Sequence, residues 1–518
     1  MLSNGFGLNS SNTRNQTSDI TSANVADLNV AYTQVAVNAK EKRGAPAVTE
    51  QTVYFAEGRD IVAANRITGC EYWRFSGDNR TRLLTGAGNQ IRSSIYYLPA
   101  TPTQPAIVYG GDLFATVYAL NAETGKKIWS AFLGTDAAHH GITGSSQVHN
   151  GTLFVPISTN EVFTTLLEFW SVCCQSHGLL QAVDAYTGKI KWTYHTAGTA
   201  WFNVWTWTMG PSGMSVWGTP MIDPENNAVV IGTGQNLSQP TTNNSDSLIS
   251  LDLNTGKVKW IFQTTKNDAW NATCGAPKGL DKKCPRPEGG DYDIGAAPIL
   301  AKLPNGNKAI LAGAKNGVIY SVNPANGALN WLRRLGSGGS LGGIHWGMAV
   351  DEKRVYASVT DVHVNKLTRI PTSIGGIDEA TKDSMAPVEN ATPGIYALDL
   401  ISGNLIWEKY IKHRSQGKDY NSLFSASLSV TNDVLLAASL NGVLHAIRTI
   451  DGQEIWSFNT AITVRGVNGV AGNGGTIDSV GPIPAGKDVY LNSGYSTFGG
   501  ANAWPAGTAN ALFVFRLP

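Results

Sequence analysis

Short apolar runs, separated by polar and glycine-rich turns, follow one another along the whole chain. Runs such as AVVIG and DVLLAASL have the length of a β-strand. None approaches the roughly 18 apolar residues that a membrane-spanning helix needs. Many short strands punctuated by glycine, with interspersed aromatic residues, are typical of all-β proteins. The pattern therefore predicts an all-β chain without a membrane span.

One ten-residue pattern occurs seven times, and in every copy a glycine precedes a tryptophan by four residues. The copies are ANRITGCEYW, LNAETGKKIW, VDAYTGKIKW, LDLNTGKVKW, VNPANGALNW, LDLISGNLIW and IRTIDGQEIW. We interpret each as a hairpin: an apolar inner strand ends in an Asp/Asn-rich turn, where glycine supplies a positive φ. The returning strand then presents its tryptophan to the neighbouring unit, against which the ring buries a large apolar area.

The spacing of the repeat predicts a closed ring. Consecutive motif tryptophans are separated by 49 residues (407 to 456) to 76 residues (331 to 407). These values suit the roughly 40–50 residues of a four-stranded propeller blade plus insertions. An eighth unit can be assembled from LNVAYTQVAV near the N-terminus and ANALFVFRLP at the C-terminus, which removes the open sheet edges. We expect residues 1–518 to form a single domain, an eight-bladed β-propeller.

Charge and short motifs exclude several functions. The formal net charge is +1 and only 15% of residues are charged, so no nucleic-acid or anionic-membrane partner is indicated. The sequence contains no P-loop, which disfavours a nucleotide-binding function. His139, His140, His177 and His345 follow no metal-ligand spacing, and we expect surface or loop histidines.

Five cysteines indicate an oxidising compartment. Cys274 and Cys284 bracket a Pro/Gly/Lys-rich loop, which suits a disulfide worth on the order of 3 kcal/mol. Cys173 and Cys174 are either two reduced neighbours or a vicinal disulfide, and Cys70 is expected to be a buried packing residue. The N-terminus has no basic region followed by an apolar core. We therefore expect a periplasmic or secreted protein whose sequence starts at its mature end.

Three insertions exceed what blades need: residues 160–178, 265–293 and 360–393. Loops of this length usually carry function or are disordered. The first two contain the four clustered cysteines and so are expected to be pinned. The third is charged and is either a lid or a surface loop.

Polar residues at the ends of apolar strands suggest a site. Asn236 follows AVVIGTGQ, Asp268 follows WIFQTT, and Trp217 lies in a Gly-bounded segment outside the repeated spacing. Amide and carboxylate groups that close apolar strands are poor packing residues. We interpret this stretch as the surroundings of a cofactor and a metal ion at the hub of the ring.

The repeat resembles a known motif. A-x-D-x-x-T-G-x-x-x-W, as in AVDAYTGKIKW, is the tryptophan-docking motif of the pyrroloquinoline quinone (PQQ) dehydrogenases, and the resemblance covers essentially the whole chain. Further blocks are similar to the polyvinyl alcohol dehydrogenases: NGFGLNSSNTRNQ, TGCEYW, CCQSHGLLQAVDAYTG, GTGQNLSQPTTNNSDSLISLDLNTGK, DAWNATC, DYDIGAAPIL, GGIHWGMAVD and LNSGYSTFGG. The motif is specific for the fold, but non-enzymatic scaffold proteins share such blades.

The resemblance implies PQQ as electron acceptor and Ca²⁺ as Lewis acid. It implies Glu161 and Asn236 as metal ligands, with Gln235 as the alternative to Asn236. It implies Asp268 as a further metal ligand and as the general base that takes the hydroxyl proton. The chain has no C-x-x-C-H haem motif, so electrons would pass to a separate cytochrome c.

For the quinone, the resemblance implies a stacking indole at Trp217 and cationic partners at Arg92 and Lys315. Thr143 and Ser215 would donate to its carboxylates. Trp346 either lines the opposite wall or packs in a blade core. In the methanol-oxidising quinoproteins a vicinal disulfide covers the quinone; here the pair Cys173 and Cys174 lies one blade later, as in the polyvinyl alcohol group, and is expected at the cofactor.

Three hypotheses remain from the sequence. The first is a PQQ- and Ca²⁺-dependent dehydrogenase of secondary alcohols, such as those of polyvinyl alcohol. The second is a non-catalytic propeller that acts as a scaffold or binds polymer. The third keeps the enzyme but gives it a bulky alcohol or a hydroxylated heterocycle as substrate. An open groove over the hub would favour the polymer and a roofed pocket a small alcohol.

Overall fold

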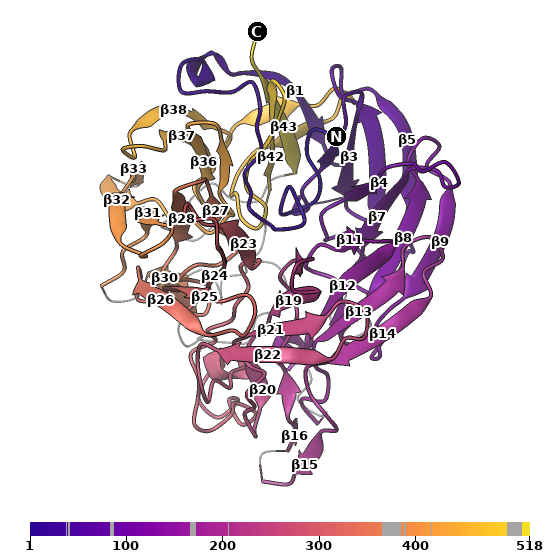
Figure 1. Ribbon diagram of the computed structural model, residues 1–518, viewed down its shortest axis with the longest axis vertical. Coiled ribbons are helices and arrows are strands. Elements are labelled where there is room, and N and C mark those ends of the chain that lie inside the picture. The colour runs from indigo at the N-terminus through magenta and orange to yellow at the C-terminus, as the bar shows by residue number, and fades with distance from the viewer. Residues whose placement is uncertain are drawn as a thin grey trace.

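The computed structural model describes residues 1–518 except 38, 40–41, 83–87, 166–171, 206, 365–384, 388–389, 416 and 495–509. Over this part of the chain, eight antiparallel sheets of at least four strands surround a central axis (Figure 1). This confirms the predicted eight-bladed propeller. In chain order the sheets are β2 (Ala47–Val48), β3 (Thr52–Glu57), β4 (Asp60–Asn65) and β5 (Glu71–Ser76); β6 (Tyr96–Leu98), β7 (Ile107–Gly111), β8 (Thr116–Asn121) and β9 (Lys127–Phe132); β11 (Gln147–His149), β12 (Thr152–Thr159), β13 (Leu179–Asp184) and β14 (Ile190–His195), extended by β10 (His140–Gly141); β18 (Met221–Asp223), β19 (Ala228–Gly232), β21 (Ser247–Asp252) and β22 (Val258–Gln263); β23 (Ile299–Lys302), β24 (Lys308–Gly313), β25 (Val318–Val322) and β26 (Leu329–Arg334); β27 (Ala349–Val350), β28 (Arg354–Val359), β31 (Gly394–Asp399) and β32 (Leu405–Lys409); β35 (Ser429–Thr431), β36 (Val434–Ala438), β37 (Val443–Arg448) and β38 (Glu454–Asn459); and β41 (Ile483–Ala485), β42 (Asp488–Ser493), β43 (Ala511–Arg516) and β1 (Asn29–Val35).

Smaller elements decorate the ring. Two-stranded sheets pair β15 (Trp201–Asn203) with β16 (Thr208–Gly210), β17 (Ser212–Gly213) with β20 (Asn236–Ser238), β29 (Val362–Val364) with β30 (Met385–Pro387), β33 (Lys412–Ser415) with β34 (Lys418–Asn421) and β39 (Thr463–Arg465) with β40 (Ala471–Asn473). Helices are short: η1 (Val25–Asp27), α1 (Glu161–Thr164) and η2 (Ala272–Gly275). None of the described helices has the length and apolar character to cross a membrane.

The ring closes as expected from the sequence. Strand β1 pairs antiparallel with β43, from Asn29 opposite Arg516 to Val35 opposite Ala511, with a register shift between Val30 and Tyr32. The last blade therefore takes its outer strand from the N-terminal end of the chain (Figure 1). This pairing occupies the outer edge of β43, which would otherwise be an open edge.

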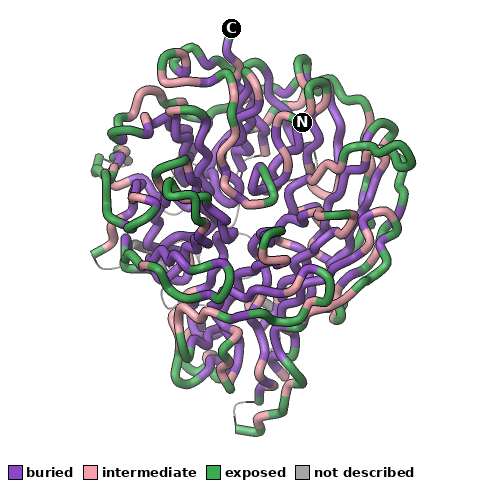
Figure 2. The backbone as a smooth tube through the Cα atoms, viewed as in Figure 1, coloured by how far each residue is buried: buried purple, intermediate pink, exposed green. Residues whose placement is uncertain are grey.

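The motif tryptophans dock on the following blade, as predicted. Each motif glycine has a positive φ, +68° at Gly256, and a Cβ atom there would lie 2.5 Å from the ring of Trp192. The indole of Trp192 donates to the carbonyl of Leu253, and that of Trp260 to the carbonyl of Pro324. The strand before each turn is the third of its blade, with a partner strand on both sides, and the tryptophan lies on the last strand. The outer strands are the more exposed part of the ring (Figure 2).

The N-terminal segment ties the blades together at the hub. The carboxamide of Asn12 donates to three carbonyls, those of Thr219, Pro220 and Pro298. The guanidinium of Arg14, which is 1% exposed, bonds carbonyls and a hydroxyl from other parts of the ring. The two side chains thus donate hydrogen bonds to buried backbone carbonyls, which would otherwise lack a partner.

The cysteines fall into three environments. Cys274 and Cys284 form the expected disulfide, and Cys173 and Cys174 form a vicinal one. Cys70 was expected to be buried, but it is an exposed free thiol in the turn before β5. The hypothesis of a lid in the third insertion falls mainly on residues 365–384, outside the described part of the chain.

Candidate functional site

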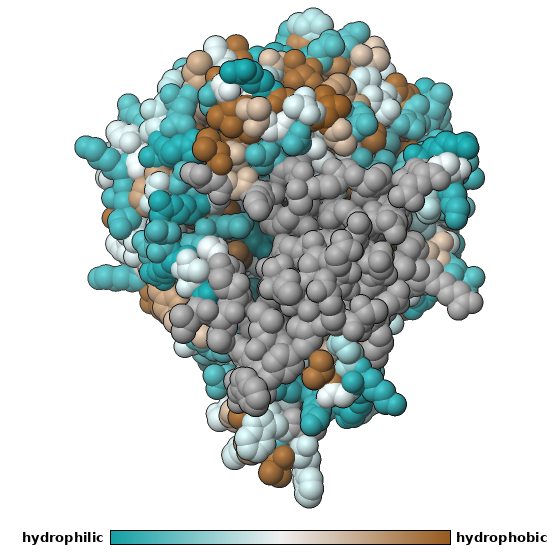
Figure 3. All heavy atoms as spheres, turned by 180° about the vertical axis from the view of Figure 1, so that it is seen from behind, coloured by the Kyte–Doolittle hydropathy of each residue, from teal (hydrophilic) through white to brown (hydrophobic). Residues whose placement is uncertain are grey.

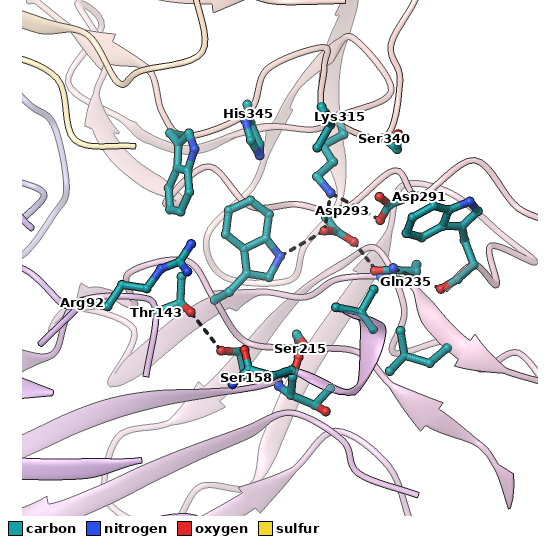
Figure 4. Close-up of a pocket in the computed structure, with 18 residues that line it drawn as sticks. Arg92, Thr143, Ser158, Ser215, Gln235, Asp291, Asp293, Lys315, Ser340 and His345 are labelled. Carbon is teal, nitrogen blue, oxygen red and sulfur yellow. Dashed lines mark hydrogen bonds and ion pairs between the residues drawn. The ribbon is translucent and has the colours of Figure 1, made fainter. Parts of the chain in front are cut away.

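Loops from several blades enclose a cavity of about 160 Å³ at the hub. Segments far apart in the sequence supply its walls, from Arg92 to Trp346. The structure brings together six residues predicted to contact the cofactor: Arg92, Thr143, Ser215, Trp217, Lys315 and Trp346 (Figure 4).

Trp217 forms one wall of the cavity. Its indole nitrogen donates to Oδ2 of Asp293 at 3.1 Å, and Trp346 packs edge-on against it with 5.0 Å between ring centroids. A Cβ atom on Gly295 would lie only 1.8 Å from the indole ring, so only glycine is tolerated there. The ring is thereby held in one orientation, as a flat aromatic surface. The sequence left two positions possible for Trp346, the pocket wall and a blade core; in the structure it lines the pocket.

Lys315 is buried between two carboxylates. Its ammonium lies 2.8 Å from Oδ2 of Asp293 and 3.3 Å from Oδ1 of Asp291 (Figure 4). Burial disfavours the charged lysine, but the two carboxylates more than offset this and raise the pKa of Lys315 above its usual value. Burial raises the pKa of Asp291 well above its ordinary range; Lys315 opposes this, while Asp293 and Asp268 reinforce it.

Of the pair Gln235 and Asn236, the first lines the cavity. The backbone nitrogen of Gln235 donates to Oδ1 of Asp293 at 2.8 Å, and its carboxamide donates to the carbonyl of Trp270. The Asn236 carboxamide lies on the other side of the strand, where it donates to the Ser212 carbonyl and accepts from the Thr242 nitrogen. Alternate residues of a strand point to opposite faces, so only one of the two can face the cavity.

Asp268 lies behind the cavity wall. Its two carboxylate oxygens accept from the backbone nitrogens of Asp291, at 3.2 Å, and of Tyr292, at 2.7 Å. A Cβ atom on Gly289 would overlap with Oδ1 of Asp268, so the loop packs closely on this carboxylate. Asp268 therefore fixes the backbone that presents Asp291, and it is Asp291 that lines the cavity.

Glu161, the other predicted metal carboxylate, is also held within the protein. It is 1% exposed and accepts from the backbone nitrogens of Gln175 and Ser176 and from the Ser176 hydroxyl. One oxygen lies within 4.8 Å of the sulfurs of Cys173 and Cys174. Its chain neighbours Asn160 and Val162 line the cavity.

The disulfide of Cys173 and Cys174 packs against Leu237 and Val162, two residues of the cavity wall. Among the described residues that line the cavity, neither cysteine is present. The pair therefore supports the wall from behind.

Hydroxyl groups line the side opposite the carboxylates. Ser158 donates to the hydroxyl of Thr143 at 3.3 Å, and the Ser215 hydroxyl accepts from the backbone nitrogen of Thr159 (Figure 4). With the guanidinium of Arg92, these groups provide donors for an anionic or carbonyl-rich ligand.

His345 lies in a loop, one of the two positions expected for it, but it is buried in the cavity wall and not at the surface. Its Nδ1 lies 2.7 Å from the hydroxyl of Ser425, which in turn bonds Asp478. Burial lowers the pKa of His345 well below its usual value, and the charges of Lys315 and Arg92 lower it further. His345 is therefore a neutral polar group in the cavity.

Sequence reasoning missed Asp291 and Asp293 as site residues. Both lie in the block DYDIGAAPIL, at the end of the insertion 265–293 that contains the disulfide of Cys274 and Cys284. The sequence did carry a signal for them: two carboxylates, separated by one residue, directly before an apolar strand. This signal is as strong as the one that indicated Asp268, a carboxylate after an apolar strand.

Comparison with known proteins supports the expected family. A profile described as "Glucose/ethanol/alcohol dehydrogenase, beta-propeller domain" matches residues 6–280, and one described as "Outer membrane protein assembly factor BamB" matches residues 392–504. A polyvinylalcohol dehydrogenase of Pseudomonas sp. is 34% identical over 95% of this chain, which spans 73% of that protein. A second, from Sphingopyxis sp., is 33% identical over 84% of this chain, which spans 64% of it.

Solved structures show the same fold. The quinohemoprotein alcohol dehydrogenase ADHIIG of Pseudomonas putida superposes with a TM-score of 0.70 at 19% identity, covering 99% of this chain and 80% of its own. A europium-containing methanol dehydrogenase gives 0.68 at 16% identity and covers 99% and 97%. With the identity to the polyvinylalcohol dehydrogenases, these findings establish that the chain is an enzyme of the PQQ-dependent (quinoprotein) alcohol dehydrogenase family.

Proposed function

We propose that the chain oxidises secondary hydroxyl groups to ketones, with polyvinyl alcohol or a similar hydroxylated compound as substrate. PQQ and Ca²⁺ would be its cofactors, and an external cytochrome c in the periplasm or outside the cell would take the electrons. The observation that carries the proposal is the hub cavity. There, the flat face of Trp217 is flanked by Arg92 on one side and by Lys315 with two carboxylates on the other.

The cavity fits the cofactor chemically. PQQ is flat and carries three carboxylates, so it needs an aromatic surface and cationic partners. Trp217 supplies the surface, Arg92 and Lys315 supply the cations, and the hydroxyls of Thr143 and Ser215 supply further donors. When bound, PQQ supplies the acceptor for the two electrons of alcohol oxidation.

Oxygen donors on the cavity wall fit a hard cation. Asp291, Asp293 and the carboxamide of Gln235 lie together there, and Ca²⁺ prefers carboxylate and carbonyl oxygens. In the described part of the chain, the predicted ligands Glu161, Asn236 and Asp268 are not among the residues that line the cavity, and their side chains bond protein donors outside it. We therefore assign the cation to the Asp291 and Asp293 side of the cavity, with Glu161 beyond the wall.

Asp291 is the group best placed to take the hydroxyl proton of the substrate. It lines the cavity, and a carboxylate at that position can accept a proton from a bound hydroxyl group. Lys315 favours that ionised form and fixes the carboxylate. Asp268 positions Asp291 through the two backbone hydrogen bonds, so its role becomes that of a positioning residue.

The scaffold hypothesis retains one specific observation, the BamB-type match of residues 392–504. A scaffold would have no use for a buried lysine paired with two carboxylates, because burying such a group is costly without a ligand or reaction that needs it. The same experiment tests both functions.

The test is alcohol-dependent dye reduction by the purified chain, with and without added PQQ and Ca²⁺. Asp291→Asn should lower kcat about 10²–10⁴-fold, the usual contribution of a general base. Asp268→Asn should lower it less, and Asp27→Asn, at an exposed aspartate, should leave it unchanged. Absence of activity with every alcohol, together with no PQQ binding, would favour the scaffold.

A further inference from the structure

A hairpin of exposed aromatic residues projects from the ring. Strands β15 and β16 form it, and it extends beyond the blades at the lower end of the molecule (Figures 1 and 3). Its apolar side chains are Trp201, Phe202, Val204, Trp205 and Trp207, and we call this segment the aromatic hairpin. Trp201 is 75% exposed and Trp205 93%. Single exposed apolar residues are ordinary, but such a cluster marks an interaction site.

The aromatic hairpin forms one wall of a surface groove. The groove encloses about 500 Å³, and the loop at Gln239 and Pro240 forms its other wall. Trp201 and Trp205 contribute rings, while Asn203 and Gln239 contribute amide groups. The lining therefore alternates apolar surfaces with groups that can bond a hydroxyl. Residues 197–213 contain no charged side chain, so the ligand that fits is uncharged.

One segment of chain links the groove to the hub cavity, although no described residue lines both. Strand β20 contributes Leu237 to the cavity wall, and two residues later Gln239 lines the groove. The base of the hairpin is fixed to the same wall. The Met209 nitrogen donates to the carbonyl of Cys173, and the Ser238 hydroxyl donates to the carbonyl of Met209. The hairpin and its groove are therefore attached to the strand that carries part of the cavity wall.

We propose that the aromatic hairpin binds a neutral hydroxylated polymer and leads it to the cavity. The inference rests on the proposed function, whose substrate class includes such a polymer. A chain of alternating methylene and hydroxyl-bearing carbons presents apolar faces to Trp201 and Trp205 and hydroxyls to the amides. A bilayer would engage the same rings, but insertion requires neither a groove nor amides within it, and the sequence of residues 197–213 offers no cationic residue to an anionic surface.

The first experiment compares substrates of different length. The double variant Trp201→Ser/Trp205→Ser, loaded with PQQ and Ca²⁺, should raise KM for polyvinyl alcohol roughly tenfold or more, because two stacking contacts are lost. Its kcat, and both constants for pentane-2,4-diol, should stay unchanged. Tyr72→Ser removes an aromatic residue of 55% exposure on an outer strand away from the groove and should change neither substrate's kinetics. An unchanged KM for the polymer would overturn the proposal.

The second experiment is independent of catalysis. Binding of polyvinyl alcohol to the chain without PQQ, followed by tryptophan fluorescence, should weaken by a similar factor in the double variant and not in Tyr72→Ser. If no alcohol is oxidised, the proposed function fails, yet this measurement still tests the hairpin. Hairpin-dependent binding to phosphatidylcholine vesicles, with polymer binding equal in all variants, would instead identify a membrane-inserting loop and overturn the proposal.

Discussion

Tryptophan serves opposite purposes in the blade ring and in the aromatic hairpin. On the outer strands, a motif tryptophan such as Trp260 is 8% exposed, donates to a carbonyl of the next blade and packs on its motif glycine. On the hairpin, Trp205 is 93% exposed. The same side chain stabilises the fold where it meets another blade and leaves a surface for a ligand where it does not. The two uses can be told apart in the sequence, because a docked tryptophan lies four residues after a motif glycine and Trp205 does not.

The largest effect is expected in the ring. Trp260→Ala should lower the free energy of unfolding by about 3–5 kcal/mol, because a buried ring and its hydrogen bond are removed. Thermal and urea unfolding of the two proteins would measure it. A loss below about 1 kcal/mol would show that the docked tryptophans contribute little to the stability of the ring.

A third use of tryptophan appears in the cavity, and its loss should affect the cofactor more than the fold. Trp217→Ala is expected to weaken PQQ binding roughly 10–100-fold, since stacking of a flat heterocycle on an aromatic ring contributes about 1–3 kcal/mol. Titration with PQQ, followed by its near-UV absorbance, measures the affinity. Trp217→Phe should retain part of it, whereas equal affinities in all three proteins would place the quinone elsewhere.

The ring could be predicted from the sequence because its cause is local and repeated. Glycine with a positive φ and tryptophan four residues later define one turn and one contact, and seven copies fix the architecture. The terminal strands had to pair because otherwise two strand edges would remain open. The third insertion, residues 360–393, shows no such repeat, and its assignment as a lid or a surface loop stays a prediction.

The site could be predicted only in part, because side-chain direction depends on register and on packing of an irregular loop. Arg92, Trp217 and Lys315 meet as expected. Gln235 and Asn236 are neighbours in extended chain, so their side chains point to opposite sides. A shift of one residue would exchange which of them faces the cavity, and the sequence does not fix that shift. Asp268 and Asp291 both follow plausible motifs, and only the folded insertion shows which carboxylate reaches the cavity.

The stability contributed by two buried histidines in the blade next to the cavity should depend on pH, whereas that of the docked tryptophans should not. Burial lowers the pKa of His140 and His177 to about 4. The Nδ1 of His140 accepts from two backbone nitrogens, which requires a neutral ring. The unfolded chain protonates near pH 6.5, so the stability from these groups is complete above that pH and is lost as pH falls toward 4.

His140→Asn should therefore flatten the decline of the urea midpoint between pH 6.5 and 4, while Trp260→Ala should lower the midpoint at every pH. The docked tryptophans do not titrate, so their contribution has no such slope. Parallel pH profiles for His140→Asn and the unmodified chain would assign the acid sensitivity to other groups.

The smallest effect is expected on the hairpin. Trp205→Ala should change the free energy of unfolding by less than about 0.5 kcal/mol, as is usual for a surface substitution, because the ring is already exposed in the folded chain. Paired with Trp260→Ala, it compares one side chain in two environments by the same thermal and urea measurements. A loss of several kcal/mol at Trp205 would mean that the ring packs against the protein. The hairpin would then be part of the fold and not a surface for ligand.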